Sequence, residues 1–385
     1  MLTASSRSPW SAGQHGVGAL LALVVLAISS CASDHDALAK KPGSGGTGGS
    51  GGGPDAAIDA PADAVEEAPT EPVGDSRITL LHAVADAPRI GFCFAPVQSG
   101  VPGLALGTPL PSGGLGYGDS FVLGNVPGID FATDDVQPIV VAAAAGDLSQ
   151  TCAALVLAAT PPADAGADAD LDGGVDAALD AAVDAAPPEL PALRALALPV
   201  LPQKTLASGY STLLAAVGCM GGPGLDDPSI ASVCGDTYRP DQPTLQPLVV
   251  RLSRITQPDR VSLQAVNGRV VSESASFGSE PPEGSSLPAF NFANNVPPGA
   301  IAPKLPYDDT NPSLLGFPLG DPQITLSPGG AVSHRFSWAG ALKRAGLGAV
   351  ENGKAYTVVL LGPSLNQGTQ LWWNPVSITL LPNSP

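Results

Sequence analysis

His82 and Asp86 are a pair of residues whose types and spacing could do chemistry. His82 lies in the apolar run Ile78–Val84, and Asp86 opens the turn-like stretch Asp86-Ala87-Pro88. An imidazole close to a carboxylate can act as a general base or hydrogen-bond a ligand. A polar side chain beside a turn can instead bond the local main chain and hold the turn in place. We expect this second, structural role for His82.

Ser120 lies in a block with a possible nucleophile. Gly118-Asp119-Ser120-Phe121 resembles the nucleophile block of a family of lipases and esterases, whose serine needs an Asp-x-x-His pair near the C-terminus. Here His334 has Ala331 three positions before it, so that pair is missing. Without a base to take its proton, Ser120 is predicted to be an ordinary hydroxyl in a turn. We predict that the chain is not an enzyme and has no catalytic residue.

Cys31 carries a different kind of chemistry, because it follows a short apolar run. The twelve residues Val17–Ile28 are too few to cross a bilayer of about 30 Å as a helix, but they suit the core of a secretory signal. Ile28-Ser29-Ser30-Cys31 resembles the bacterial lipobox, in which the cysteine thiol receives a diacylglycerol. An ordinary signal peptide with a chance cysteine is the alternative. We predict a lipoprotein signal peptide over residues 1–30 and a mature chain that is lipidated at Cys31.

The remaining cysteines, Cys93, Cys152, Cys219 and Cys234, are even in number in a chain that we expect to be exported. Two disulfides are the simplest interpretation, with three possible connectivities. We favour Cys219–Cys234, which brackets a loop rich in Gly, Pro and Asp, and by elimination Cys93–Cys152. Metal binding is the alternative, but no pair has C-x-x-C spacing and few histidines are present. We therefore predict no metal site and no cofactor.

Asp168–Asp176 begins like a calcium-binding loop, with oxygen-bearing side chains at positions 1, 3, 5 and 9 and glycine at position 6. Position 12, which should supply a bidentate carboxylate, is Leu179. Asp-Ala repeats continue on both sides, so we interpret the match as chance alignment within a biased segment.

Trp372 and Trp373 are possible ligand contacts. Adjacent residues of a strand point to opposite faces, so one of these rings is expected in the core and the other at the surface. An exposed ring could stack on a sugar. The alternative is packing of the ring against the proline-rich loops at a sheet edge.

The formal net charge of −18 is concentrated in two segments. Residues 32–75 hold nine acidic side chains and residues 158–190 hold eight, out of 35 in the chain. The rest of the mature chain has 18 acidic side chains against 14 Lys and Arg, a balance of −4. This balance argues against nucleic acid as a partner.

Glycine and proline make up 87 of the 385 residues and separate short runs of Val, Leu, Ile and Ala, which predicts an all-β chain. Residues 31–75 are rich in Gly, Ser, Ala and Asp and are predicted to be a disordered tether with a span of roughly 35 Å. The acidic segment 158–190 is predicted to be a disordered insertion. The expected strands cover residues 78–84, 89–94, 138–142, 152–157, 210–217, 248–252, 261–266 and 354–362.

Two parts of the chain follow the same plan. Residues 248–266 parallel the opening segment 78–94, and residues 354–362 parallel 208–218. Matching beginnings and ends predict two copies of one domain. We place the first domain at 76–244 and the second at 245–385.

Arg77–Pro88 is similar to the opening strand of a family of secreted bacterial domains of unknown function, domain-of-unknown-function family 4397, which reads Arg-Val-Arg-Val-Val-His-Ala-Ser-Pro-Asp-Ala-Pro. Gly209–Leu213 and Ala355–Val359 resemble its closing strand, which often reads Tyr-Thr-Val. Val84-Ala85 departs from the Ser-Pro of the family. The resemblance implies tandem β-sandwich domains of the immunoglobulin-like or Greek-key type, and no activity.

These observations together predict a non-enzymatic lipoprotein of the cell envelope, held by the lipid on Cys31 at the outer membrane or surface of a Gram-negative bacterium. Its expected role is structural or in binding, with a glycan or an envelope protein as a possible partner. A carbohydrate-binding or adhesive module is the alternative, and a secreted hydrolase is a remote one.

Overall fold

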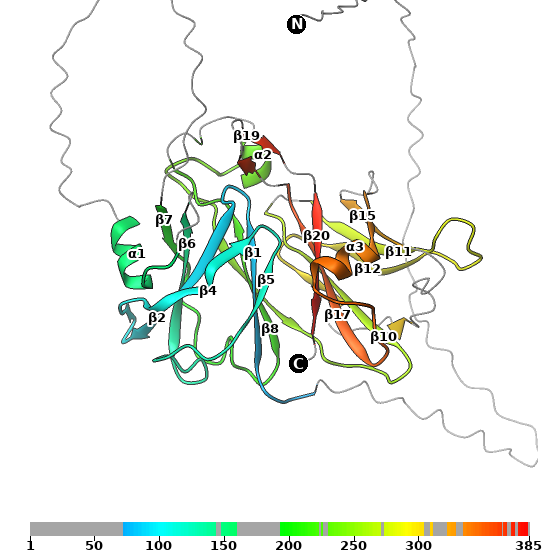
Figure 1. The fold of residues 1–385 in the computed structure, drawn as a ribbon, viewed down its shortest axis with the longest axis horizontal. Helices are drawn as coiled ribbons and strands as arrows, with labels where there is room; N and C mark the ends of the chain where they lie inside the picture. The colour runs from blue at the N-terminus through cyan, green and yellow to red at the C-terminus, as the bar shows by residue number, and fades with distance from the viewer. Residues whose placement is uncertain are drawn as a thin grey trace, which may run out of the picture. The chain divides into compact units, whose positions relative to one another are not determined.

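The computed structural model describes residues 72–143, 148–159, 193–222, 225, 230–270, 273–303, 309–310, 322–328, 334–363, 365–367, 371–373 and 376–383. All of them belong to one compact unit, Glu66–Pro385, in which strands dominate (Figure 1). The predicted all-β class is therefore confirmed. The signal peptide, Cys31, the tether as far as residue 71 and the insertion from residue 160 onward lie outside the described residues.

The first half of this unit, Arg77–Leu252, contains two sheets. The four-stranded sheet has the order β5-β1-β8-β9, and β1 runs parallel to β8. The five-stranded sheet has the order β3-β2-β6-β7, with β4 also pairing with β2. The elements are β1 (Arg77–Val84), β2 (Arg89–Gln98), β3 (Val101–Pro102), β4 (Leu106–Gly116), β5 (Ser120–Leu123), β6 (Asp135–Ala143), α1 (Cys152–Ala159), β7 (Leu193–Ala197), β8 (Ser211–Gly218), α2 (Ala231–Cys234) and β9 (Gln246–Leu252).

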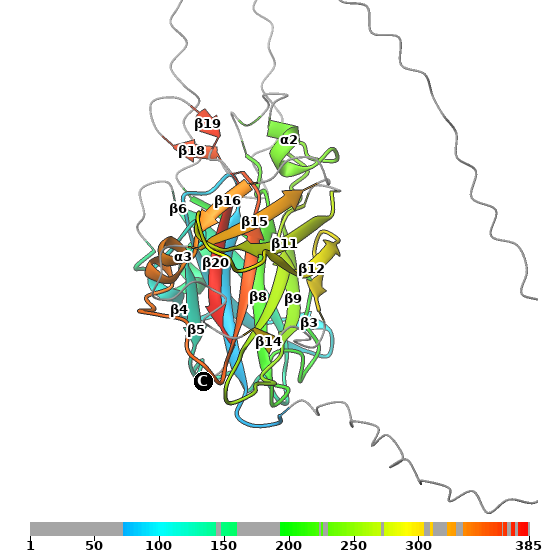
Figure 2. The ribbon, with the colours of Figure 1, turned by 90° about the vertical axis from the view of Figure 1, so that its right-hand side faces the viewer.

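The second half, Val261–Pro382, also contains two main sheets. One has the order β13-β10-β17-β20, with β14 also pairing with β10, and the other has the order β12-β11-β15-β16. A two-stranded hairpin, β18–β19, lies with α2 at the end of the unit opposite the C-terminus (Figure 2). The elements are β10 (Val261–Asn267), β11 (Ala275–Glu280), β12 (Phe290–Val296), β13 (Ile301–Ala302), β14 (Asp309–Thr310), β15 (Gln323–Pro328), β16 (His334–Ser337), α3 (Trp338–Arg344), β17 (Lys354–Leu361), β18 (Leu365–Gln367), β19 (Leu371–Trp373) and β20 (Ser377–Pro382).

The two halves repeat one strand order. β1 lies parallel to β8, which pairs with β9, just as β10 lies parallel to β17, which pairs with β20. The orders β4-β2-β6-β7 and β12-β11-β15-β16 correspond in the same way. The predicted match between 208–218 and 354–362 agrees with this topology.

The predicted match between the openings does not agree with it. The counterpart of β1 is β10, which covers 261–267, whereas the segment 248–252 lies in β9 and pairs with β8. β9 thus completes a sheet of the first half, although it follows the predicted domain boundary at residue 244. Both segments are short apolar runs beside a Pro-Asp turn, so composition alone did not separate a closing strand from an opening one.

The strands β1, β8, β10 and β17 are buried on both faces of their sheets. On one face of β1 and β8, Leu80 and Leu214 pack in a cluster with Phe92 of the neighbouring sheet. On the opposite face, Leu81 and Leu213 share a cluster with residues of the second half, including Val359, Leu361 and Leu381. The two halves are therefore joined by apolar faces of their central sheets. Burial on both faces also explains why these strands read as continuous apolar runs without alternation.

The segment 152–157 is a correction to the sequence analysis, which predicted a strand. It forms the helix α1, Cys152–Ala159. The Thr151 hydroxyl accepts a hydrogen bond of 3.3 Å from the Ala154 main-chain N–H, in the manner of an N-cap. Alanine and leucine, which fill most of this segment, are strong helix formers. A short apolar run does not by itself distinguish a buried helix from a strand.

Candidate functional site

His82 holds the turn that follows β1, as the sequence analysis expected. Its Nδ1 accepts a hydrogen bond of 3.1 Å from the Val84 N–H, so Nε2 carries the proton and donates to the Ala87 carbonyl at 3.0 Å. The ring is fully buried, and this burial lowers the pKa of His82 to about 3. Both ring nitrogens are therefore engaged in a neutral side chain, which is unsuited to serve as a base near neutral pH.

Asp86 is buried in the same turn and does not bond His82 in the described structure. Its carboxylate accepts hydrogen bonds from the main-chain N–H groups of Met220 (2.9 Å) and Gly221 (2.8 Å). Arg194 donates to the Asp86 carboxylate at 2.9 Å and to the Asp86 main-chain carbonyl at 2.7 Å. The carboxylate and its partner thus join the β1–β2 turn to β7 and to the segment after β8.

Ser120 is the first residue of the edge strand β5, where the sequence analysis expected a turn. The neighbouring Asp119 carboxylate accepts a hydrogen bond of 3.1 Å from the Gly116 N–H and caps the turn before the strand. Nearby, the Tyr117 hydroxyl donates to the Gly362 carbonyl of the second half at 2.5 Å. Burial raises the pKa of Tyr117 above its ordinary value, so this phenol is a protonated structural contact.

The four cysteines among the described residues pair as the sequence analysis favoured. Cys93 pairs with Cys152 across a Cα–Cα distance of 5.7 Å, and Cys219 pairs with Cys234 across 5.4 Å. The first pair fastens α1 to β2 and the second fastens α2 to the end of β8. All four are buried.

Cys31, Trp372 and Trp373 were also predicted to be site residues. Cys31 lies outside the described residues. Trp372 and Trp373 belong to β19, which pairs with β18, but their side chains lie outside the described part. Their role as ligand contacts stays a prediction. Trp338 is fully buried, and its indole N–H donates to the Ser279 hydroxyl at 3.1 Å.

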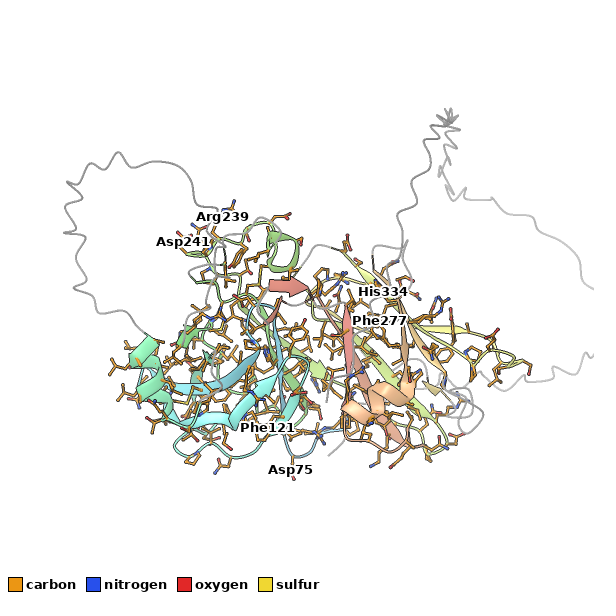
Figure 3. The ribbon with its side chains drawn as sticks, turned by 45° about the horizontal axis from the view of Figure 1, so that its top comes forward. Asp75, Phe121, Arg239, Asp241, Phe277 and His334 are labelled. Carbon is orange, nitrogen blue, oxygen red and sulfur yellow. A yellow bond between two sulfur atoms is a disulfide. The ribbon has the colours of Figure 1, made fainter. Side chains whose placement is uncertain are left out.

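A cleft with a volume of about 520 Å³ lies where the two halves meet. The first half contributes residues of β4 and β5, including Phe121, and the second half contributes residues of α3, β16 and β20 (Figure 3). The lining residues include Phe336, Asp119, Ser120 and Arg344. Apolar, acidic, basic and hydroxyl-bearing residues therefore line one hollow, which is typical of a site that binds an amphipathic ligand.

A second hollow, of about 530 Å³, lies beside α2 and the start of β9. Its lining includes Ser232, Asp236, Thr244 and Gln246, and no aromatic or basic side chain is among the described residues that line it. It therefore offers fewer kinds of contact than the cleft between the halves.

Sequence reasoning missed both Arg194 and the cleft. Arg194 follows Asp86 by 108 residues, so no local motif joins them. The cleft is assembled from segments around residues 111–121, 336–345 and 376–379. The block Gly118–Phe121 was considered only as a nucleophile block, and the other two segments carry no motif. The signal available in the sequence was Arg344 at the end of a short amphipathic segment, which was not sufficient to single it out.

Comparison with known proteins adds no relative. No family model matches the chain, and no curated protein matches it. The resemblance of Arg77–Pro88 to a family of secreted domains therefore stays a prediction.

The described residues can also be searched for metal-ligand groups and membrane-spanning helices. They include no group of three or more His, Cys, Asp or Glu side chains placed to hold a metal ion. Among the helices in this part of the chain, none has both the length and the apolar character needed to span a bilayer.

Proposed function

We propose that this chain is a non-enzymatic lipoprotein of the bacterial cell envelope, lipidated at Cys31 and carrying a β-structured unit with a binding or structural role. The unit is held on the tether 31–75, and its two halves act as one body of two tandem β-sandwich domains. The outer membrane of a Gram-negative bacterium is the location that we propose.

The observation that carries this proposal is that the polar groups in the interior form structural hydrogen bonds. His82, Asp86 and Tyr117 are buried or half-buried side chains of the first half whose types are capable of acid or base chemistry. Each of them forms hydrogen bonds that connect strands, turns or the two halves. Such bonding supports a rigid scaffold whose purpose is to present a surface.

The apolar contact between the halves supports the same role. Leu81, Leu213 and Val359 lie in one buried cluster that spans both halves. A shared core of this kind keeps the residues from each half at fixed positions in the cleft, and fixed positions reduce the entropic cost of binding a ligand.

The test is to express the chain with its own signal in a Gram-negative host and compare it with the Cys31→Ala variant. We expect wild type to incorporate a labelled fatty acid and to partition into the detergent phase. Cys31→Ala should do neither, because one lipid-bearing residue supplies the membrane affinity. A Ser29→Ala variant keeps a small residue before the cysteine and should behave as wild type. Membrane association that survives Cys31→Ala would overturn the proposal.

A further inference from the structure

We propose that the cleft between the halves binds an extended peptide that carries an acidic side chain, by adding the peptide to the open edge of β5. This inference rests on the proposed binding role and names the class of ligand. The occupant is a partner peptide strand.

The main chain of β5 leaves hydrogen-bonding groups open on this side. The His82 N–H donates to the Asp119 carbonyl at 3.2 Å, and the Gly118 N–H donates to the His82 carbonyl at 2.9 Å, so the main chain of His82 faces β5. Main-chain direction alternates along a strand. The main-chain N–H and C=O groups of Phe121, which is opposite Leu80 in the register, therefore point toward β1.

The same alternation gives the direction of the main-chain groups of Ser120 and Val122. They stand opposite Leu81 and Thr79, whose main-chain groups face the parallel strand β8. The N–H and C=O groups of Ser120 and Val122 consequently point away from β1. Among the described strands, β5 has no second neighbour. Ser120 lines the cleft, and Val122 lies further along the same edge, outside the cleft lining, with its apolar side chain 46% exposed.

The opposite wall of the cleft has an edge of the same kind. The Gly268 N–H donates to the Leu360 carbonyl at 2.9 Å, so the main chain of Leu360 faces β10. Its register partner Ile378 therefore presents its main-chain groups on the open side of β20. Arg344 of α3 reaches the Ile378 carbonyl there, at 3.4 Å. This contact covers one acceptor of β20, which makes β5 the more available edge.

Arg344 is the basic residue of the cleft lining, and the acidic one, Asp119, already accepts a hydrogen bond of 3.1 Å from the Gly116 N–H. We therefore infer the charge of the ligand from Arg344. Its guanidinium lines the cleft, and no carboxylate of the described residues lies within salt-bridge distance of it. A guanidinium binds a carboxylate through two parallel N–H donors, more strongly than it binds a neutral carbonyl. Phe121 and Phe336 offer half-buried rings for apolar side chains of the same ligand. Main-chain pairing with alternate side chains in pockets is the established physical basis of strand addition.

The experiment selects a random peptide library against the purified mature chain in detergent micelles and measures the enriched peptides by fluorescence anisotropy. Four variants are compared. Arg344→Ala removes the charge, and Lys343→Ala removes the neighbouring exposed charge that does not line the cleft. Val122→Pro removes the outward N–H of β5 while sparing the β1 bonds, and Val122→Ala keeps that N–H.

We expect enriched peptides to contain Asp or Glu among alternating apolar residues. Arg344→Ala and Val122→Pro should weaken their binding about tenfold or more, while Lys343→Ala and Val122→Ala should stay within about twofold of wild type. Amide exchange at Ser120 and Val122 should slow when the peptide binds. Unchanged circular dichroism and thermal midpoint identify variants that remain folded, and Arg344→Ala alone decides the outcome if Val122→Pro unfolds.

The inference is overturned if no peptide is enriched, or if the enriched peptides bind Arg344→Ala as well as wild type. A glycan array probes the other class of ligand, and a glycan that loses binding in Arg344→Ala would show that the cleft takes a saccharide instead. Failure of the peptide experiment with Cys31 still lipidated would leave the lipoprotein role standing. Loss of lipidation with peptide binding intact would do the reverse.

Discussion

The Ser211 hydroxyl donates a hydrogen bond of 2.5 Å to the main-chain carbonyl of Asn383, a residue 172 positions further along the chain. Arg254 donates to the same hydroxyl at 2.8 Å and also to the Asp75 carbonyl at 2.6 Å. Four parts of the chain thus meet at one point: the beginning of β8, the connection between the halves, the segment that enters the unit and the last described residue.

Asn383 should be among the most sensitive polar residues of the protein. Its buried side chain accepts from the Thr357 hydroxyl at 2.8 Å and donates to the Ser253 carbonyl at 2.9 Å. Its amide also donates to the Gln264 side-chain oxygen at 3.2 Å. Asn383→Ala removes these buried hydrogen bonds and should lower the free energy of unfolding by about 1–3 kcal/mol. Urea denaturation measures the loss. The exposed Asn352→Ala is the control, and an equal effect of the two variants would contradict this account.

The two carboxylates that pair with arginine should differ sharply in their contribution. Asp86 and Arg194 are almost completely buried, so Asp86→Asn should cost about 3 kcal/mol by leaving Arg194 without its counter-charge. Glu280 and Arg335 form an exposed pair, for which Glu280→Gln should change stability by less than about 1 kcal/mol. Equal losses in chemical denaturation would contradict the assignment of Asp86 as a structural carboxylate.

His82 should make stability depend on pH. Burial lowers its pKa from 6.5 to about 3, so between these values the unfolded chain binds a proton that the native protein excludes. The contribution is fully present above pH 6.5 and is lost as the pH falls toward 3, with a slope of at most about 1.4 kcal/mol per pH unit. Urea denaturation at several pH values should give a smaller acid-side loss for His82→Asn than for wild type. Identical slopes in wild type and His82→Asn would refute the prediction.

The two cysteine pairs should also contribute unequally. Cys93–Cys152 closes a separation of 59 residues and Cys219–Cys234 one of 15. In the chain-entropy account, removing the first pair as a double alanine variant costs about 4 kcal/mol and removing the second about 3 kcal/mol. Unreduced peptide mapping checks the pairing, and denaturation of the two double variants checks the order. Four free thiols in material from the cell envelope would contradict both.

The central strands could be predicted from the sequence because their residue types favour a buried strand. β8 and β17 consist mostly of small or branched apolar residues and have glycines beside them, and both lie where they were expected. β4 was missed because its eleven residues, Leu106–Gly116, include two prolines and several glycines and read as a loop. Its register against β2 shifts at two places, so a periodic pattern would not have revealed it.

The site was predictable only where its contacts are local. His82 bonds residues two and five positions away, and these bonds follow from a histidine beside a turn. The partner of Asp86 comes from β7, beyond the acidic insertion, and the cleft needs the apolar faces of both halves to meet. Such contacts depend on how sheets stack, which a single sequence does not display.

The acidic insertion should be dispensable for folding, since the elements on either side of it already hold each other. α1 ends at Ala159 and β7 begins at Leu193, and Val156 and Leu193 pack on one cluster with the buried Cys93–Cys152 pair. Deleting Pro162 to Pro187 leaves a connection of ordinary length between these neighbours. Shortening a long loop changes its closure entropy only slowly, by about 0.6 kcal/mol for each halving of its length. The deletion should therefore leave the thermal midpoint nearly unchanged in scanning calorimetry. A broad transition of reduced enthalpy, or protected amides across 164–184 in hydrogen exchange of the intact chain, would show instead that the insertion is part of the folded unit.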